Sequence, residues 1–135
     1  MSYFTHSADE AESAFYAAFE HLDIQLMESV WLDADDAYCI HPGGPVQEGF
    51  ETVLKQWRFI LQDASPPEMS YRVVQKSVNG NLAVHLVEEH IGAADQATLV
   101  LATNIYKNTA EGWRLMAHHA SLPPNLTAAA TGGLH

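Results

Sequence analysis

The sequence has few basic residues, one cysteine and no long apolar run, and each shortage excludes a class of protein. Six Lys and Arg face 17 Asp and Glu, which leaves a formal net charge of −11. Nucleic-acid binding needs clustered basic groups, and an anionic membrane surface repels a chain of this charge, so we expect neither partner. The sequence has no run of about 18 apolar residues, the length needed to span a bilayer. Its first residues also lack the basic segment followed by an apolar one that is typical of a secretion signal. We therefore expect a cytoplasmic protein.

The single cysteine, Cys39, cannot form an internal disulfide. It lies in an apolar run without a neighbouring Lys or Arg, which predicts a small buried side chain rather than a nucleophile. Eight histidines are many for this length, but no spacing typical of a metal site occurs. We expect no metal and no cofactor, although a metal site built from His41, Glu88 and His119 is geometrically conceivable.

The hydrophobic pattern predicts one domain, residues 1–122, followed by a flexible tail, residues 123–135. Ser7 and Glu10 form a capping box at the start of a first helix, a second helix begins near residue 22, and a third spans about 49–62. Strands are predicted at about 37–41, 69–78, 82–91, 98–107 and 113–121. This order indicates an α+β fold, with three helices in the N-terminal half packed on a curved, mostly antiparallel sheet. Such a sheet closes into a cone whose mouth can hold a small molecule.

The last predicted hairpin, residues 99–121, contains two adjacent histidines, His118 and His119. Side chains alternate faces along a strand, so His118 and His119 point in opposite directions. We expect the face with Trp113, Leu115 and His119 to line a core or pocket, and His118 to face solvent or a partner subunit. The acidic residues of the first helix are interpreted as a solvated face: Glu10, Glu12 and Glu20.

The order and spacing of these segments resemble the nuclear transport factor 2-like superfamily, in its SnoaL-like and ketosteroid-isomerase-like branch. The resemblance covers about residues 8–121. It rests on the segments Phe15-Tyr16-x-Ala18-Phe19, His41-Pro42-Gly43-Gly44, Ala102-Thr103-Asn104, Gly112-Trp113-Arg114 and His118-His119-Ala120-Ser121, together with Asp23, Trp31 and Trp57. It implies the cone-shaped fold described above.

The resemblance also implies a site. In ketosteroid isomerases a carboxylate base precedes a proline at the end of the first strand, and that position is His41. In the same enzymes a tyrosine seven residues before an aspartate donates a hydrogen bond to the developing oxyanion, and the corresponding residue is Tyr16. An acidic donor on the penultimate strand corresponds to Asn104. Imidazole can accept a proton at neutral pH, while a phenol and an amide can donate to a substrate oxygen. His119 would orient or assist.

Further residues are predicted to bind a substrate: Trp31, Tyr38, Trp57, Glu88, His90 and Tyr106. Each member of the site also has a structural interpretation. His41 could bond a backbone carbonyl, Tyr16 could be a core aromatic, and Asn104 could fix a strand end. The tryptophans could serve packing alone.

Two functions follow. The first is an isomerase, dehydratase or cyclase that acts without a cofactor on a small apolar, oxygenated molecule by proton abstraction in a cone-shaped pocket. The alternative is a non-catalytic ligand-binding or association module. Ile105, Met116 and His118 on the outer face of the sheet indicate a homodimer. The segment from Trp113 to Ser121 also resembles the association domain of calmodulin-dependent kinases.

Overall fold

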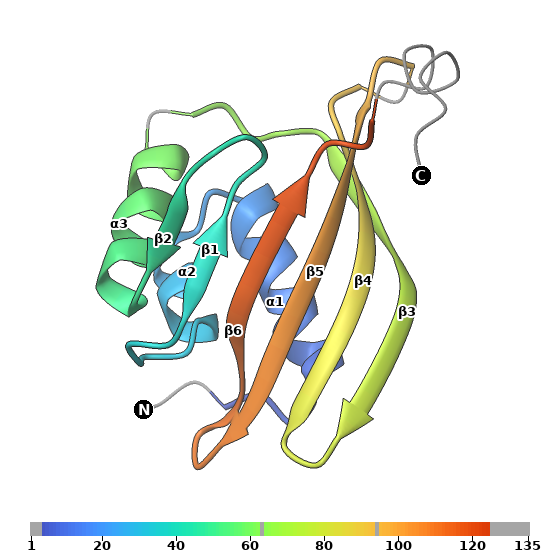
Figure 1. The fold of residues 1–135 in the computed structure, drawn as a ribbon. Coiled ribbons are helices and arrows are strands. Elements are labelled where there is room, and N and C mark those ends of the chain that lie inside the picture. The colour runs from blue at the N-terminus through green and yellow to red at the C-terminus, as the bar shows by residue number, and fades with distance from the viewer. Residues whose placement is uncertain (1–3, 63, 94, 125–135) are drawn as a thin grey trace.

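The computed structural model describes residues 4–62, 64–93 and 95–124, in which three helices and six strands form one layered unit (Figure 1). All six strands belong to one sheet, in the order β2-β1-β6-β5-β4-β3. β1 runs parallel to β6, and every other neighbouring pair is antiparallel. The predicted fold class is therefore confirmed. The elements are α1 (Ala8–Glu20), α2 (Ile24–Val30), β1 (Tyr38–Ile40), β2 (Val46–Glu48), α3 (Phe50–Leu61), β3 (Met69–Asn79), β4 (Leu82–Ile91), β5 (Thr98–Thr109) and β6 (Gly112–Ser121).

The helices start where the sequence predicts. The Ser7 side chain caps α1 by accepting a hydrogen bond of 3.0 Å from the Glu10 backbone N–H. Asp23 caps α2 in the same way through Leu26 N–H, at 3.0 Å. Such caps satisfy backbone donors that have no partner within the helix. The short strand β2 was not predicted, because three residues are too few to show a period of two.

The core lies between the helices and the inner face of the sheet, and α1 crosses behind β4, β5 and β6 in the view of Figure 1. Phe15 of α1 meets Trp31 and Trp57 edge-on, with ring centroids 6.2 and 5.6 Å apart. Cys39 is fully buried, as predicted, and burial raises the pKa of its thiol to about 12. A thiol that stays protonated at neutral pH is a poor nucleophile.

A β-bulge in β6 decides which histidine faces the core. Ile105 pairs with Ala117, but the next residue of β5, Tyr106, pairs with Leu115, so Met116 is an extra residue. The extra residue reverses the alternation of faces along the rest of the strand. His118 therefore points inward and is buried. The predicted orientation of both histidines, with His119 inward, was wrong, because sequence alternation contains no sign of the bulge.

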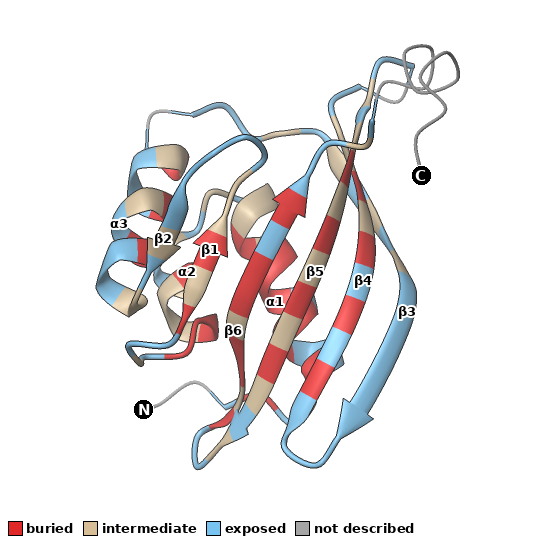
Figure 2. Ribbon diagram, in the orientation of Figure 1, coloured by how far each residue is buried: buried red, intermediate tan, exposed pale blue. Residues whose placement is uncertain are grey.

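In Figure 2 buried residues alternate with partly exposed ones along β5, as expected for a strand with one face on the core. In β6 adjacent buried residues lie on both sides of Met116, where the bulge interrupts the alternation. Edge strand β3 is largely exposed. None of the helices in the described part of the chain has the length and apolar composition needed to cross a bilayer. Most of the predicted flexible tail, residues 125–135, lies outside the described residues.

Candidate functional site

Polar side chains from four elements meet in the core, where apolar residues would be expected. α1 contributes two of them four residues apart on one helix face, and the strands contribute the others from positions that alternate with apolar residues. All are less than a tenth exposed. We refer to this set as the polar core: Glu12, Tyr16, His85, Glu89, Asn104, Tyr106 and His118.

Tyr16, Glu89 and Asn104 form the centre of the polar core. The Tyr16 hydroxyl donates a hydrogen bond of 2.6 Å to Glu89 Oε2. It accepts one of 3.0 Å from Asn104 Nδ2. The amide oxygen of Asn104 accepts a hydrogen bond of 2.5 Å from His118 Nδ1, so both ends of the amide are held. His118 Nε2 lies 3.9 Å from Glu89 Oε2. A phenol, a carboxyl, an amide and an imidazole thus converge.

Burial sets the protonation of this centre. Loss of solvation raises the pKa of Glu89 to about 7; the hydrogen bond from Tyr16 opposes this rise, and the nearby Glu12 charge adds to it. Burial, together with the adjacent Glu89 charge, raises the pKa of Tyr16. Burial lowers the pKa of His118 to about 3, assisted by repulsion from His41 and His119. At neutral pH His118 and Tyr16 are therefore uncharged, and Glu89 can both take up and release a proton.

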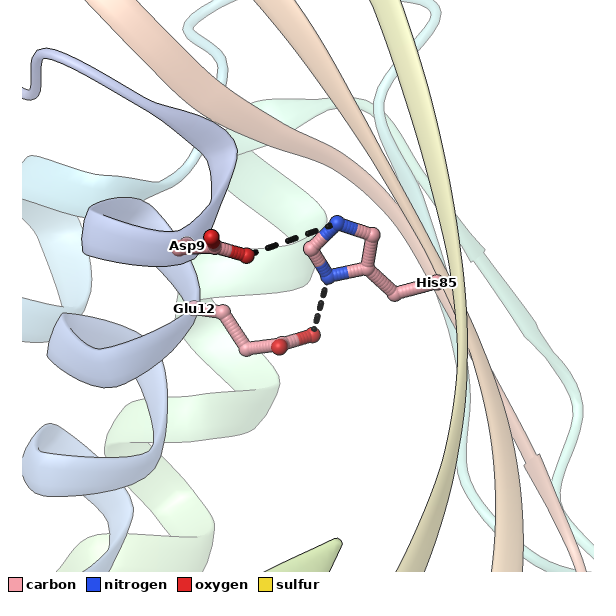
Figure 3. A group of neighbouring side chains, drawn as sticks. All are labelled: Asp9, Glu12 and His85. Atoms are coloured by element: carbon pink, nitrogen blue, oxygen red, sulfur yellow. Dashed lines mark hydrogen bonds and ion pairs between the residues drawn. The ribbon is translucent and has the colours of Figure 1, made fainter. Parts of the chain in front are cut away.

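The other end of the polar core is centred on Glu12. Its Oε2 accepts hydrogen bonds of 2.9 Å from the Tyr106 hydroxyl and from His85 Nδ1. The second ring nitrogen of His85, Nε2, points toward Asp9 at 3.9 Å, as Figure 3 shows. Asp9 is exposed and forms an ion pair of 2.9 Å with Lys76 Nζ. This end of the network therefore reaches the surface at the start of α1.

A cleft between α1 and β3 reaches the ring of Tyr16. It has a volume of about 170 Å³, and its walls include Ser13, Tyr16, Met69 and Tyr71. The ring of Tyr71 stacks on that of Tyr16, with centroids 4.1 Å apart and planes inclined by 21°. Tyr71 also pairs with Glu89 across the sheet. A small molecule in this cleft would therefore lie against the stacked rings of Tyr16, which bonds Glu89, and Tyr71, which lies opposite Glu89 in the sheet.

The structure brings together two of the four predicted catalytic residues. Tyr16 and Asn104, which were predicted to bind the same substrate oxygen, are in direct contact with each other. His41 instead lies 3.6 Å from Cys39 Sγ and edge-on to Trp57, and it has no hydrogen bond to Tyr16 or Asn104 in the described structure. Burial lowers the pKa of His41. His119 is exposed on the outer face of the sheet, opposite Thr103, because of the bulge at Met116.

The predicted substrate-binding residues also separate into two groups. Trp31, Trp57 and Tyr106 are buried, the first two in packing and the third in the polar core. Tyr38, Glu88 and His90 lie on the outer sheet face instead, because Tyr38 pairs with the outward Ala117 and the β4 residues alternate with His85 and Glu89. Glu88 there binds Arg72 at 2.9 Å. Glu88 and His119 lie on strands separated by β5, so the conceivable metal site with His41 is not assembled.

Sequence reasoning missed Glu12, His85 and Glu89. The interpretation of Glu12 as part of a solvated helix face was wrong, since it is 2% exposed. Its position four residues before Tyr16 was an available signal, because residues at that spacing share a helix face. In β4 the inward face carries Ala83 and Val87 between the polar residues, and the outward face carries larger aliphatic groups. The sequence of β4 is therefore equally compatible with either of its two faces being buried.

Comparison with known proteins now identifies the fold family. The SnoaL-like domain family matches residues 9–125. The chain is a SnoaL-like domain. It belongs to the nuclear transport factor 2-like superfamily, in agreement with its solved structural neighbours.

The most informative neighbours of this SnoaL-like domain are two crystal structures. A candidate calcium/calmodulin-dependent protein kinase type II association domain from Thiobacillus denitrificans is 31% identical, with a TM-score of 0.83, over 90% of this chain and 98% of that one. A candidate dehydratase of the NTF2-like family from Streptomyces avermitilis is 34% identical, with a TM-score of 0.77, over 85% of this chain and 92% of that one. Relatives of similar identity thus carry names of two different functional classes.

More distant similarity supports the fold alone. A candidate ketosteroid isomerase from Parabacteroides distasonis is 16% identical, with a TM-score of 0.68, over 87% of this chain and 89% of that one. Among curated proteins, the F-box protein SKIP8 of Arabidopsis thaliana is 20% identical over 118 residues, which is 87% of this chain. The chain spans about half the length of that relative.

Proposed function

We propose that this SnoaL-like domain is an acid–base enzyme of the isomerase or dehydratase type, with Glu89 as the group that carries the proton. The observation behind the proposal is the hydrogen bond of 2.6 Å between Tyr16 and a buried carboxyl whose pKa is raised to about 7. A general base is most effective when its pKa lies near the working pH. The dehydratase and isomerase names of two structural neighbours agree with this class of chemistry.

The proposed reaction begins with a small apolar molecule that has an acidic C–H bond next to a carbonyl group. Glu89, as the carboxylate, removes that proton: the C–H bond breaks, an O–H bond forms on the carboxyl, and the electron pair moves onto the carbonyl oxygen. Tyr16 turns its hydroxyl from Glu89 to this oxygen and stabilises the enolate by hydrogen bonding. Asn104 holds the Tyr16 oxygen at 3.0 Å. In a β,γ-unsaturated ketone, Glu89 returns the proton to the γ-carbon and the C=C bond shifts into conjugation, which gives an isomer. In a β-hydroxy ketone, the electron pair of the enolate instead forms the C=C bond, the C–O bond breaks, and the hydroxyl takes the proton from Glu89 and leaves as water.

Access to Glu89 in this proposal runs through the cleft between α1 and β3. Tyr71 must swing away from Tyr16, and it can do so at low cost because it belongs to an edge strand and is only half-buried. The volume of about 170 Å³ suits a substrate of one or two rings once Tyr71 has moved. We further propose that this chemistry takes place in the cytoplasm.

Deuterium exchange into 2-tetralone, an apolar ketone with an acidic C–H bond, tests the proposal without knowledge of the natural substrate. The protein should accelerate exchange above the buffer rate in D₂O, with a rate that rises through about pH 7 as Glu89 ionises. Glu89→Gln should abolish the acceleration. Glu88→Gln is the matched control, because it removes the neighbouring carboxylate on the opposite face of β4. Equal exchange with Glu89→Gln and the unmodified protein would refute the role of Glu89.

A second candidate function is association, for which the outer sheet face provides a specific observation. Val84 and Leu86 of β4 are 39% and 38% exposed, beside the half-buried Leu101 and Ile105 of β5. Exposed aliphatic groups that gather on one face of a sheet are typical of an interface. The neighbour from Thiobacillus denitrificans is itself named as an association domain.

We propose that this face forms a homodimer, which is compatible with catalysis on the opposite face. Sedimentation velocity should give a dimer for the unmodified chain and a monomer for Leu86→Lys. Phe59→Lys is the control, since Phe59 is 76% exposed on α3, away from the sheet. A monomer at every concentration of the unmodified chain would refute the homodimer.

A further inference from the structure

We propose that His85 Nε2 and the Asp9 carboxylate bind a divalent metal ion of the Zn²⁺ class at the start of α1, independently of the chemistry at Glu89. Three potential ligand residues, Asp9, Glu12 and His85, place one donor atom each within 4.8 Å of one another. Figure 3 shows how they divide: Glu12 lies at one ring nitrogen of His85 and Asp9 at the other. A single ion can use only one nitrogen of the ring, so the roles of the two carboxylates differ.

Glu12 fixes the imidazole for metal binding. Its Oε2 lies 2.9 Å from Nδ1, and a carboxylate there accepts the Nδ1–H proton. The tautomer assigned by this bond leaves the lone pair on Nε2. A histidine that donates its other N–H to a carboxylate is the usual arrangement around protein-bound metals, because it fixes the ring and increases its basicity. Glu12 itself is held by Tyr106 at 2.9 Å.

His85 Nε2 is available for a ligand. His85 is 1% exposed, and in the described part of the chain its Nε2 forms no hydrogen bond. His85 lines a surface cavity of about 190 Å³, whose walls also include Asp9, Lys76 and Trp113. The cavity has room for water molecules that would complete the coordination of an ion held by two protein ligands. Imidazole nitrogen and carboxylate oxygen together suit Zn²⁺ or a similar transition metal better than Ca²⁺ or Mg²⁺.

Lys76 is the cation that such an ion must displace. Its ammonium group lies 2.9 Å from Asp9 Oδ1, and both side chains are about half exposed. Exposed ion pairs of this kind contribute little to stability, so the lysine can leave at small cost. The net charge of −11 also favours the exchange of a monovalent for a divalent cation. Competition with Lys76 gives the proposal an unusual consequence, because removing a positive side chain should strengthen metal binding.

Titration of the purified chain with Co²⁺ and Zn²⁺ tests the proposal. Calorimetry should give one site per chain, and Co²⁺ should develop visible absorption bands that Zn²⁺ removes. His85→Asn is the critical variant: its amide nitrogen can replace Nδ1 in donating to Glu12, but it has no counterpart of Nε2. We expect at least a 100-fold loss of affinity for His85→Asn. For Glu12→Gln the expected loss is about 10- to 100-fold, the usual effect of removing a carboxylate behind a ligating histidine.

Substitutions at the surface test the proposed metal site even if a substitution in the core unfolds the protein. Asp9→Asn should weaken binding about tenfold or more, and Lys76→Met should strengthen it. His119→Ala, which removes an exposed histidine on the other sheet face, should leave it unchanged. The proposal is overturned if Asp9→Asn and Lys76→Met bind as the unmodified chain does, or if His119→Ala loses the site. It is equally overturned if folded His85→Asn retains full affinity.

Discussion

The ionisation of Glu89 should oppose folding, and Glu89→Gln should make this cost measurable. The glutamine amide keeps an oxygen that can accept the hydrogen bond from Tyr16, but it never becomes charged. The pKa of Glu89 rises from its ordinary value of 4.5 to about 7 in the folded chain. A group whose folded pKa is raised favours the folded state below the unfolded value, and this contribution is lost as the pH rises through the folded value. Relative to the unmodified chain, Glu89→Gln should therefore become more stable with increasing pH.

The size of the effect follows from the shift. A change of one pKa unit corresponds to about 1.4 kcal/mol, so the full effect is about 3 kcal/mol. Between pH values of about 5.5 and 8, the free energy of unfolding should change by about 2 kcal/mol of this total, because part of the effect is already present at pH 5.5. The lower limit keeps the chain above its isoelectric point of about 4.9, where precipitation is expected. Glu89 is 2% exposed, so solvent screening does not reduce the estimate much.

Urea unfolding followed by fluorescence of the buried Trp31 and Trp57 measures the free energy of unfolding at each pH. The difference between Glu89→Gln and the unmodified chain should move by about 2 kcal/mol in favour of the variant as the pH rises from about 5.5 to 8. Glu88→Gln, on the outer face, should show only a small difference, because exposed ion pairs such as Glu88 with Arg72 contribute little to stability. A constant difference for Glu89→Gln would refute the raised pKa and with it the proposed general base.

Three further substitutions test other parts of the structure. His118→Gln should show the opposite trend to Glu89→Gln in the same unfolding curves, because burial lowers the pKa of His118 to about 3. The stability that depends on neutral His118 is present above the unfolded pKa of 6.5 and is lost as the pH falls below it. At pH 5.5 the unmodified chain should have lost about 1 kcal/mol relative to His118→Gln. Gly112→Ala should cost more than about 2 kcal/mol in those curves, since φ is +96° and the added Cβ would overlap the backbone of Thr5. Tyr71→Ala should open the cleft to Glu89 and increase ketone exchange several-fold in the deuterium assay; slower exchange would refute the proposed access route.

The sequence predicted the fold well because the features that set it are local. The capping box at Ser7 and the spacing of apolar residues in each helix and strand depend on residues within a few positions of one another. The family resemblance brought Tyr16 and Asn104 together correctly, across 88 positions of sequence separation. These contacts follow from the topology of the fold, which the order of helices and strands specifies.

The errors arose where one residue changes the register. Met116 is an ordinary strand residue by composition, yet its bulge exchanges the environments of His118 and His119. A one-residue shift moves every later side chain to the other face, and hydrophobic alternation did not mark it here. Glu89 was missed for a related reason: Glu88, Glu89 and His90 are adjacent polar residues, and only the pairing of β4 with β5 shows which of them is buried.

The surroundings of Asn104 explain why this chain has an amide at the position where the family resemblance places an acidic donor. The polar core already contains two carboxylates, Glu12 and Glu89, and Asn104 Nδ2 lies 3.5 Å from the first and 3.0 Å from the hydroxyl bound to the second. An aspartate could still accept from His118 but would lose both donated hydrogen bonds and add a negative charge beside two buried carboxyl groups. Asn104→Asp should therefore cost about 3–5 kcal/mol at neutral pH, the usual cost of an unpaired buried charge.

The loss of stability in Asn104→Asp should become smaller at acidic pH, because the introduced carboxyl group can again donate a hydrogen bond once it is protonated. A packing defect without charge repulsion would not depend on pH. Asn108→Asp is the matched control, because it makes the same substitution at an exposed position of the same strand. Unfolding curves at neutral pH should separate the two variants by several kcal/mol, and the separation should narrow toward about pH 5.5. Equal stability of the two variants would mean that the amide is not needed to hold the two buried carboxylates together, and the hydrogen-bonded centre proposed for catalysis would lose its support.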